Sequence, residues 1–358
     1  MKKTILHFIY RLGRGGAETM LVRVVQELSE YNNIIVEMYG DNAFGKELLC
    51  DKYISMNLRS TFLLPLAIKK LRRIIIEHNV DMVHTHLFWP TAIARIATPT
   101  KIPLVTTIHT SVSAALDYKL WRIRVIDRIT YRLRKSIIIG VSKTALKDYF
   151  TFLNLKPSRS YLLNTFVDVN RFDVQNLKRI DNAGKFLIVS VGALRAGKNY
   201  EYLVKAFEQL NFTNVELHIY GAGPLGEKLM QMIEKSKVPV ILKGEVSNIN
   251  ELLPLYDLYI SASAFEGFSL AILEAMAMKL PLLLSDIPSF REQCEETALY
   301  FSLNNKNDFI DKLIAFMNEP GMRNDISQKG HERVLRYFTL PDHVTELRRI
   351  YKQTFSDA

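Results

Sequence analysis

Residues 258–285 read LYISASAFEGFSLAILEAMAMKLPLLLS, which is an apolar run, a loop, a helical pattern and a second apolar run. The two runs, Leu258–Ser261 and Leu282–Ser285, are short and unbroken, as is typical of strands covered on both faces of a parallel sheet. Between them, Glu266 and Glu274 are separated by seven residues. The stretch therefore predicts a strand, a loop that carries Glu266, a helix that carries Glu274, and a second strand.

The junction between this loop and helix has residues that suit an anion. Gly267 lets the main chain come close to a ligand. Ser269 is a candidate N-cap, so the amides from Phe268 to Ala271 are expected to face an anion such as a diphosphate. A surface helix with two solvated acids is the alternative, and the spacing alone favours it because glutamate is usually exposed. The remainder of the chain favours ligand binding.

The composition indicates two globular domains. The chain has 358 residues, of which 48% are hydrophobic and 23% are charged, and a domain usually holds about 100–200 residues. No apolar run reaches the ~18 residues that a membrane span needs.

The first residues resemble a signal peptide, but His7 and Arg11 interrupt the apolar stretch, so we expect a buried first strand. The two cysteines, Cys50 and Cys294, are far apart, which favours a reducing compartment and argues against structural zinc.

Strand-like and helix-like segments alternate along most of the chain, which predicts an α/β fold. The pattern breaks after Phe166 in a polar stretch that runs to Gly184, and then starts again. Two such series predict two doubly wound parallel-sheet domains, which we place at residues 1–168 and 183–338. The expected strands are Ile5–Ile9, Ile34–Tyr39, Asp81–Thr85, Leu104–Ile108, Ile137–Val141, Tyr161–Leu163, Phe186–Val191, Val215–Tyr220, Val240–Lys243, Leu258–Ser261, Leu282–Ser285 and Leu299–Phe301.

Ligands of doubly wound sheets bind at the carboxyl ends of the strands, so the loops that follow strands are where chemistry is expected. Residues 12–18 follow the first strand and contain Gly16 in a glycine pair, whose bare amides suit a phosphate or a sugar. A simple tight turn is an equal alternative. Residues 191–199 place Arg195 and Lys198 before a helix, where cations and helix amides would bind a diphosphate. A pair of solvated cations is the competing interpretation there.

Two more turns lie at strand ends in the second domain. Gly221 and Gly223 precede a helix, and residues 244–246 could offer backbone groups, Val246 among them, to a nucleobase. Each is consistent with an ordinary turn. Their common position at the carboxyl ends of strands favours a binding role.

Three histidines follow strands in the first domain. His84 and His86 share a strand face by alternation, and His109 comes directly after the next strand. A metal at this pair is disfavoured because no third ligand with suitable spacing is evident, so no metal site is expected. The preferred interpretation is a hydrogen bond from His109 to a polar substrate, with a buried structural histidine as the alternative.

These motifs resemble those of the family 4 glycosyltransferases of the GT-B fold. Residues 15–18, 164–168, 191–198, 221–224 and 266–274 occur in the order seen in that family. The resemblance implies two Rossmann-like domains facing a central cleft, with the helix at 341–358 packing back onto the first domain. It implies a nucleotide-sugar donor, a UDP-sugar or a GDP-sugar, and no cofactor. It also implies transfer that retains the anomeric configuration without a metal, and no D-x-D motif is found.

The resemblance assigns roles to individual residues. Lys198 resembles the lysine that neutralises the donor diphosphate, Glu274 the carboxylate that binds the ribose, and Glu266 the acid that contacts the donor sugar. His109 matches a histidine near the reacting sugar. The expected catalytic residues are Glu266 and His109; the expected donor-binding residues are Gly16, Arg195, Lys198, Gly221, Gly223, Val246, Gly267, Phe268, Ser269, Leu270 and Glu274; the expected acceptor-binding residues are Glu18, His84 and His86.

One departure from the family pattern concerns the donor diphosphate. The family commonly has an arginine directly after the first glycine of its Gly-Arg-Leu motif, and here Ala193 occupies that position. Arg195, two residues further on, is a candidate to replace the missing charge. Without it, diphosphate binding would rest on Lys198 and helix amides, and donor affinity would be weaker.

The net charge of +10 calls for an anionic partner. Residues 118–135 predict a cationic amphipathic helix with aromatic flanks, and residues 69–73 add a second basic patch. Each Lys or Arg near an anionic leaflet contributes ~1 kcal/mol, so we expect a cytoplasmic protein held peripherally on the inner face of the cell membrane. That location suits a glycan or polyprenyl-diphosphate-linked acceptor in capsule, O-antigen or lipopolysaccharide assembly. A solvated helix that packs its apolar stripe is the alternative.

Three other functions remain open at this point. A nucleotide-sugar epimerase of the same architecture would release a rearranged sugar without an acceptor, and a phosphorylase would depend on inorganic phosphate. A non-catalytic nucleotide-binding or nucleic-acid-binding module could use the positive charge. The basic residues do not match a recognisable nucleic-acid-binding motif, so nucleic acid is not an expected partner.

Overall fold

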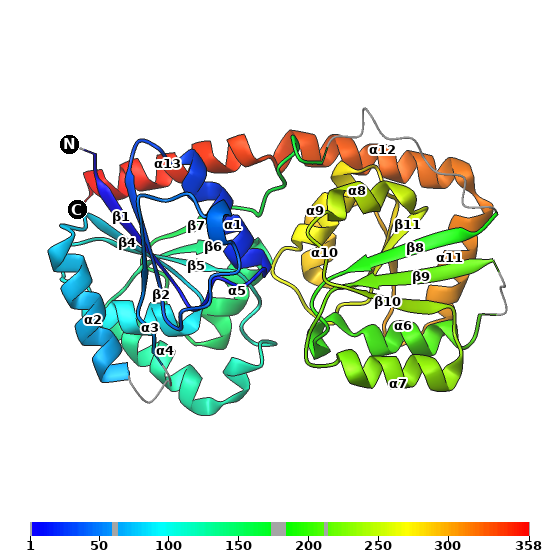
Figure 1. Cartoon of the computed structure of the whole chain (residues 1–358), viewed down its shortest axis with the longest axis horizontal. Coiled ribbons are helices and arrows are strands. Elements are labelled where there is room, and N and C mark those ends of the chain that lie inside the picture. The colour runs from blue at the N-terminus through cyan, green and yellow to red at the C-terminus, as the bar shows by residue number, and fades with distance from the viewer. Residues whose placement is uncertain (1, 59–63, 173–183, 211–213, 358) are drawn as a thin grey trace. The chain divides into compact units, whose positions relative to one another are not determined.

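The computed structural model describes residues 2–58, 64–172, 184–210 and 214–357. The chain divides into two compact units, residues 1–165 with 341–358, and residues 166–340. Each unit is a parallel sheet flanked by helices (Figure 1). The predicted fold class, two doubly wound parallel sheets, is confirmed. The predicted break between the domains falls partly on residues 173–183, which lie outside the described residues, as does the predicted first residue of the second domain.

The first unit holds a seven-stranded sheet in the order β3-β2-β1-β4-β5-β6-β7. All pairings in it are parallel. The strand order reverses between β1 and β4: β2 and β3 lie on one side of β1, and β4 to β7 lie on the other. Its strands are β1 (Thr4–Ile9), β2 (Asn32–Glu37), β3 (Lys52–Ser55), β4 (Met82–His86), β5 (Leu104–Ile108), β6 (Ile137–Gly140) and β7 (Ser160–Leu162).

Two layers of helices cover this sheet because its strands alternate apolar side chains between two buried faces. Leu6 and Phe8 of β1 pack with α2 and α3, whereas Ile9 packs with α1. Helix α13 also belongs to this unit, where Tyr351 is fully buried. The helices of the unit are α1 (Gly16–Glu27), α2 (Leu64–Glu77), α3 (Phe88–Ala97), α4 (Trp121–Leu133), α5 (Lys143–Phe152) and α13 (Leu340–Ser356).

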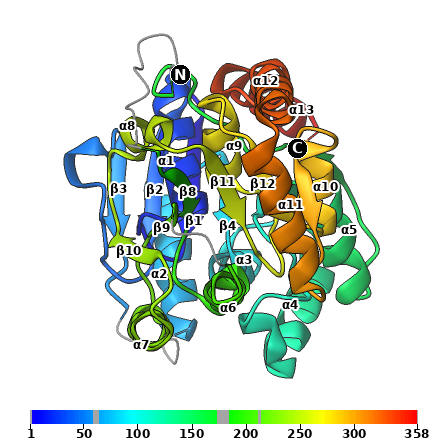
Figure 2. The same cartoon turned by 90° about the vertical axis from the view of Figure 1, so that its right-hand side faces the viewer.

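The second unit holds a six-stranded parallel sheet in the order β10-β9-β8-β11-β12-β13. Helices α6, α7 and α11 pack their apolar faces against one side of it, and α9 lies on the side opposite α6 and α7 (Figure 2). The strands are β8 (Phe186–Val191), β9 (Val215–Tyr220), β10 (Val240–Gly244), β11 (Leu258–Ser261), β12 (Leu282–Ser285) and β13 (Leu299–Phe301). The helices are α6 (Tyr200–Phe207), α7 (Gly226–Ser236), α8 (Ile249–Leu252), α9 (Leu270–Ala277), α10 (Pro288–Cys294), α11 (Lys306–Asn318) and α12 (Pro320–Tyr337).

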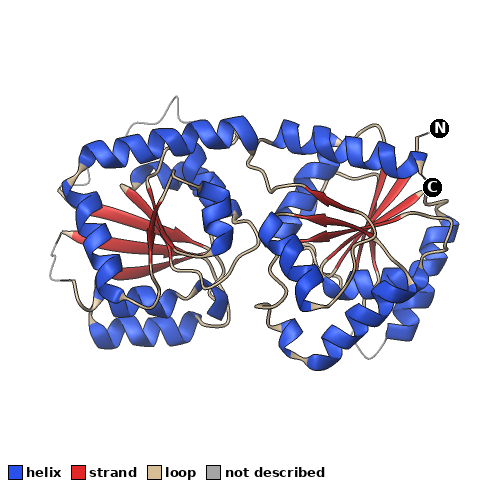
Figure 3. Cartoon of the chain, turned by 180° about the vertical axis from the view of Figure 1, so that it is seen from behind, coloured by secondary structure: helices blue, strands red, loops and turns tan. Residues whose placement is uncertain are grey.

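Strands and helices alternate along both units, as the sequence predicts (Figure 3). Strands β5, β8, β9, β11, β12 and β13 begin and end where the apolar runs do. Strand β3 was not predicted, because its sequence, Lys-Tyr-Ile-Ser, has only two apolar residues and lies at a sheet edge. The helix expected at 118–135 is shorter than predicted: a 3-10 turn at Asp117–Lys119 precedes α4, which begins at Trp121 and ends at Leu133.

The reversal of strand order positions the loops where ligands bind. In such sheets the crevice lies at the carboxyl ends of the two strands that flank the reversal. In the second unit these strands are β8 and β11, and in the first unit they are β1 and β4. Among the described residues, no helix is long and apolar enough to cross a bilayer.

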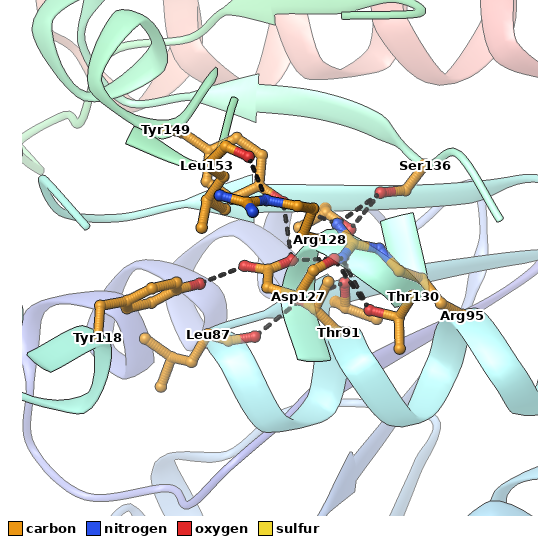
Figure 4. A network of polar contacts seen from close by, with 12 residues as sticks. Leu87, Thr91, Arg95, Tyr118, Asp127, Arg128, Thr130, Ser136, Tyr149 and Leu153 are labelled. Atoms are coloured by element: carbon orange, nitrogen blue, oxygen red, sulfur yellow. Dashed lines mark hydrogen bonds and ion pairs between the residues drawn. The ribbon is translucent and has the colours of Figure 1, made fainter. Parts of the chain in front are cut away.

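A buried ion pair joins helix α4 to helix α3 (Figure 4). Arg95 Nη1 of α3 lies 2.5 Å from Asp127 Oδ1 of α4, and the two side chains are 0% and 3% exposed. Tyr118 and Tyr149 both donate hydrogen bonds to the Asp127 carboxylate. Burial by itself would lower the pKa of Arg95, but the neighbouring Tyr149 and Asp127 raise it, so the guanidinium stays charged. The pair fixes which face of α4 points inward.

We predict that Asp127→Ala lowers the free energy of unfolding of the first unit by about 3–5 kcal/mol, because it leaves the Arg95 charge buried without a partner. Both tryptophans of the chain, Trp89 and Trp121, lie in this unit, so urea denaturation followed by tryptophan fluorescence reports on it. The matched control is Glu77→Ala, which removes an exposed ion pair with Arg73 and should cost at most about 1 kcal/mol. If the two substitutions lowered the free energy of unfolding equally, the stabilising role of the buried Arg95–Asp127 pair would be contradicted.

Candidate functional site

In the second unit, the loops that follow β8 and β11 meet at the reversal of strand order. The Ala264 amide after β11 donates a 2.9 Å hydrogen bond to the carbonyl oxygen of Gly197 after β8. Gly197 also packs against the Phe265 ring, where a Cβ atom would lie 2.9 Å from the ring carbon Cζ. A larger residue at position 197 would have to displace the Phe265 ring, so glycine favours this close contact between the two loops.

The two charged residues expected at this site are brought together. Lys198 Nζ lies 2.6 Å from Glu266 Oε1, and the two side chains are 13% and 12% exposed. Ser263 donates a 3.1 Å hydrogen bond to the same carboxylate oxygen. An ion pair with little exposure is held in place and weakly screened by solvent. The site therefore presents a fixed cation beside a fixed carboxylate.

Glycines in the turns after β8 and β9 allow these turns to pack directly on each other. A Cβ atom on Gly221, whose φ is +144°, would lie 2.1 Å from the carbonyl oxygen of Gly192. A Cβ atom on Gly223 would lie 2.6 Å from the carbonyl oxygen of Leu194. Packing between the two loops thus accounts for both glycines, and their expected contact with the donor stays a prediction.

The loop-to-helix junction differs from expectation in one respect. Ser269 is the N-cap of α9, as predicted, but its side chain makes no capping hydrogen bond. Its amide donates instead to Gln293 Oε1 at 2.8 Å, and Gln293 Nε2 donates back to the Ser269 carbonyl oxygen at 2.8 Å. The prediction that the Ser269 amide is free to face an anion is therefore wrong in this structure. Gly267 and Phe268 are buried in the same turn, and Phe268 packs edge-on against Phe338.

Glu274 lies on α9, as predicted, and Leu270 is the first residue of this helix. Both side chains are half-buried. Burial raises the pKa of Glu274 to about 7, and the positive charge of Arg171 opposes that rise. A carboxyl group with this pKa gains or loses its charge near neutral pH. A ligand that hydrogen-bonds to the carboxylate would favour the charged form.

The other expected donor residues occupy more open positions. Arg195 is exposed in the loop after β8, and Val246 is half-buried after β10. Gly16 is exposed as the first residue of α1. Glu18 folds back on the helix start, where its carboxylate occupies the space that a Cβ atom on Gly15 would need. This contact is typical of an acidic residue that stabilises a helix N-terminus, a role additional to the acceptor contact predicted for Glu18.

In the first unit, the three expected histidines lie together and line one cavity of about 30 Å³. His86 Nδ1 lies 3.0 Å from His109 Nε2. Both ring nitrogens of His84 are hydrogen-bonded, to Tyr351 at 2.6 Å and to Thr107 at 2.7 Å. Burial lowers the pKa of His109 to about 4, so this ring is neutral at pH 7. His109 can therefore accept or donate one hydrogen bond, but it does not supply a positive charge.

Sequence reasoning missed several residues at these places. His7 and His343 also line the histidine cavity. His7 could have been found from the strand order that is usual in doubly wound sheets, in which β1 pairs with β4; the register places His7 opposite His84. His343 and Gln293 carried no such signal, since they lie on helices whose packing against these loops is set only by the tertiary fold.

The strand order and the helix layers of both units define the GT-B class of glycosyltransferases, whose solved members have the same fold. HepE from Anabaena, solved in complex with UDP-glucose, aligns with a TM-score of 0.84 at 15% identity and covers 98% of this chain and 99% of its own. A glycosyltransferase from Rickettsia africae aligns with a TM-score of 0.80 at 20% identity over 100% of both chains.

Sequence comparison identifies the family within that class. The chain matches the family described as "Glycosyltransferase Family 4" over residues 14–171 and the family described as "Glycosyl transferases group 1" over residues 174–333. The two matches together span most of the sequence. The chain belongs to the family 4 glycosyltransferases, and it is an enzyme of the glycosyltransferase class. The resemblance drawn from the motifs is confirmed.

Two characterised relatives align over nearly the whole chain. One is the N-acetylgalactosamine-N,N'-diacetylbacillosaminyl-diphospho-undecaprenol 4-alpha-N-acetylgalactosaminyltransferase of Campylobacter jejuni, 24% identical over 91% of this chain and 93% of the relative. The other is the O-antigen biosynthesis glycosyltransferase WclY of Escherichia coli, 24% identical over 96% of each chain.

The raised pKa of Glu274 predicts a pH dependence of stability. The folded state holds the Glu274 proton up to about pH 7, whereas the ordinary pKa of a glutamate is 4.5. The unfolded chain therefore binds fewer protons between these values, so the free energy of unfolding should fall as the pH rises from about 4.5 to 7.

Glu274→Gln, which mimics the neutral acid, should remove this dependence and be more stable than the wild type by about 1–3 kcal/mol above pH 7. Urea denaturation followed by circular dichroism between pH 5 and 8 measures the difference. Glu234→Gln, on the exposed face of α7, is the control and should leave the pH profile unchanged. A Glu274→Gln curve parallel to that of the wild type would contradict the prediction.

Proposed function

We propose that this enzyme is a retaining glycosyltransferase that moves a sugar from a nucleotide-diphosphate sugar to a glycan or a polyprenyl-diphosphate-linked acceptor in cell-surface polysaccharide assembly. The observation that carries the proposal is the Lys198–Glu266 pair, which lies at the strand reversal of the second unit with an N–O distance of 2.6 Å. That place in a doubly wound sheet is where nucleotides bind.

The donor is held by the second unit through both charged residues. Lys198 neutralises the diphosphate, and Glu266, already beside it, accepts hydrogen bonds from hydroxyl groups of the donor sugar. Glu274 accepts hydrogen bonds from the ribose. The donor is a UDP-sugar or a GDP-sugar, and no cofactor takes part. The UDP-glucose complex of HepE, which has the same fold, supports a uridine nucleotide as the first to be tested.

The leaving diphosphate is stabilised by protein cations rather than by a metal. Negative charge develops on the diphosphate as the bond to the anomeric carbon breaks, and that carbon gains oxocarbenium character. Lys198, the exposed Arg195 and the amides at the start of α9 other than that of Ser269 bind the departing group. Among the described residues, we identify no carboxylate suited to form a covalent glycosyl intermediate. The acceptor hydroxyl therefore attacks on the face that the diphosphate leaves, which retains the configuration.

The acceptor is assigned to the first unit. His109, neutral and hydrogen-bonded to His86, provides a polar contact for a sugar, and Glu18, His84 and His86 lie in the same unit. The name of the Campylobacter jejuni relative specifies a diphospho-undecaprenol acceptor, and that of the Escherichia coli relative specifies O-antigen biosynthesis. These relatives support a lipid-linked acceptor for this enzyme as well.

Lys198→Ala should weaken UDP binding more than tenfold and lower turnover by about 10²–10³, because it removes a cation from the developing charge. Thermal shift with UDP, GDP and ADP measures binding, and release of the nucleotide with polyprenyl-diphosphate glycans as acceptors measures turnover. Lys228→Ala is the matched control, since it removes a similar 2.8 Å ion pair to Glu201 at the surface. Glu266→Gln should bind UDP nearly normally and lose turnover.

Three results would contradict the proposal. Wild-type turnover in both variants would remove the pair from the mechanism. Loss of UDP binding after chelation of divalent ions would show that the diphosphate needs a metal. Inversion at the anomeric carbon, or release of a rearranged nucleotide sugar without an acceptor, would point to a different reaction, the second to an epimerase.

The exposed face of α4 is suited to an anionic membrane surface. Asp127, the acid of this helix, is buried against Arg95, so the charges that face outward on α4 are positive. Trp121 is 63% exposed and Leu133 is 75% exposed. Most residues exposed in and around the helix have apolar or basic side chains, as interfacial helices do: Leu116, Lys119, Leu120, Trp121, Arg122, Ile129, Arg132, Leu133 and Lys135. Asp117 is the one exposed acid among residues 116–135.

The second basic patch lies in the same helix layer. Helix α3 packs against both α2 and α4, so all three cover the same face of the sheet (Figure 1). Lys69, Arg72 and Arg73 of α2 are exposed. We infer that this layer holds the enzyme peripherally on the cytoplasmic face of the membrane, where a lipid-linked acceptor is available.

The double substitution Arg122→Glu and Arg132→Glu should reduce binding to vesicles that contain anionic lipid at least tenfold, since each basic residue contributes ~1 kcal/mol. Vesicle flotation at low and high salt measures binding. Lys235→Glu, exposed on α7 of the second unit, is the control and should bind like the wild type. Equal wild-type binding to neutral and anionic vesicles, or no effect of salt, would contradict the membrane surface.

A further inference from the structure

The proton position on His7 is fixed by its neighbour Asn33. The Asn33 amide nitrogen donates hydrogen bonds to the carbonyl oxygens of Leu28 and Tyr31, at 2.9 and 3.4 Å, which sets the orientation of the amide. Asn33 Oδ1 therefore faces His7 Nε2 at 3.3 Å and can only accept. His7 must carry its proton on Nε2, so its Nδ1 carries a lone pair.

That lone pair has no partner in the described part of the chain. His7 is 1% exposed, and its Nδ1 is buried without a hydrogen bond. The same is true of Nε2 of His86, which is 5% exposed. Both residues line the same cavity of about 30 Å³. Buried polar atoms without partners are costly and call for an explanation.

A third histidine completes the cluster. One ring nitrogen from each of His7, His84 and His86 lies within 4.8 Å of the others. Three imidazole nitrogens bound to one ion at about 2.0–2.1 Å each would be closer than this, so small ring rotations are required. On binding the ion through Nε2, His84 would lose its hydrogen bond to Thr107. It would keep the hydrogen bond between Nδ1 and Tyr351.

We propose that His7, His84 and His86 bind one divalent transition-metal ion, of which Zn²⁺ is the best match. Neutral imidazoles are the ligands that Zn²⁺, Cu²⁺ and Ni²⁺ prefer, and three of them leave a fourth position for a water molecule in the cavity. The hydrogen bond from His7 Nε2 to Asn33 is the outer contact that ligating histidines usually make through their second nitrogen.

A bound metal ion would affect the position of the proton on His109 through a single hydrogen bond, that between His86 and His109. An ion on His86 Nε2 leaves the proton of that ring on Nδ1, which then donates to His109 Nε2 at 3.0 Å. His109 must then carry its own proton on Nδ1. Occupancy of the site thus selects the tautomer of the residue proposed to contact the sugar. This consequence rests on the proposed function, whereas metal binding itself does not.

Titration of tag-free protein, first dialysed against chelator, tests the site. We expect one Co²⁺ per chain by visible absorption and one Zn²⁺ per chain by equilibrium dialysis. His7→Gln and His86→Gln should each lower the affinity at least tenfold. His78→Gln, just after α2 and outside the cavity, is the control and should bind like the wild type. The assay needs no sugar donor, so failure of the proposed function would not affect it.

X-ray absorption by the Zn²⁺-loaded wild type needs no variant and guards against variants that fail to fold. It should show three imidazole nitrogens at about 2.0–2.1 Å. Absence of stoichiometric binding, an oxygen-only ligand shell, or undiminished binding in folded His7→Gln and His86→Gln would overturn the proposal. The cavity would then hold water alone.

Discussion

The ion pair between Lys198 and Glu266 is the interaction on which the proposed donor site depends. It joins the loops that follow β8 and β11, and these are the two strands at which the order of the sheet reverses. The contact of Gly197 with Phe265 holds the same loops together by packing. A cation that is already fixed beside a carboxylate does not have to be ordered when the diphosphate binds, so less of the binding free energy is lost.

Much of this arrangement could be predicted from the sequence because it follows from chain direction and periodicity. Parallel strands put their carboxyl ends at one edge, which brings Lys198 near Glu266 although they are far apart in the chain. The same reasoning could have paired His7 with His84, since the order of β1 and β4 was implied by the fold class. The spacing of His84 and His86 within one segment does not reveal His7, because His7 lies on a different strand.

Other features could not be predicted, because they depend on side-chain packing between elements. The amide of Ser269 is bonded to Gln293, which lies on α10 and reaches the start of α9 only in the folded unit. Strand β3 forms because the edge of the sheet supplies hydrogen-bond partners to a sequence with little apolar character. The periodicity of α4 does not indicate the buried Arg95–Asp127 pair, because Asp127 cannot be distinguished there from the other polar residues of the helix.

Helix α13 follows the second unit in the sequence and yet belongs to the first unit. Tyr351 donates to or accepts from His84 in the interior, and Arg348 pairs with Glu30 at the surface. On a ribosome, the second unit is therefore fully synthesised before the first has all of its core. Domains commonly fold in order from the N-terminus, but here the first β-sheet lacks one of its covering helices until α13 has been synthesised. The covalent order of the chain thus makes the histidine-lined half of the enzyme the last to mature.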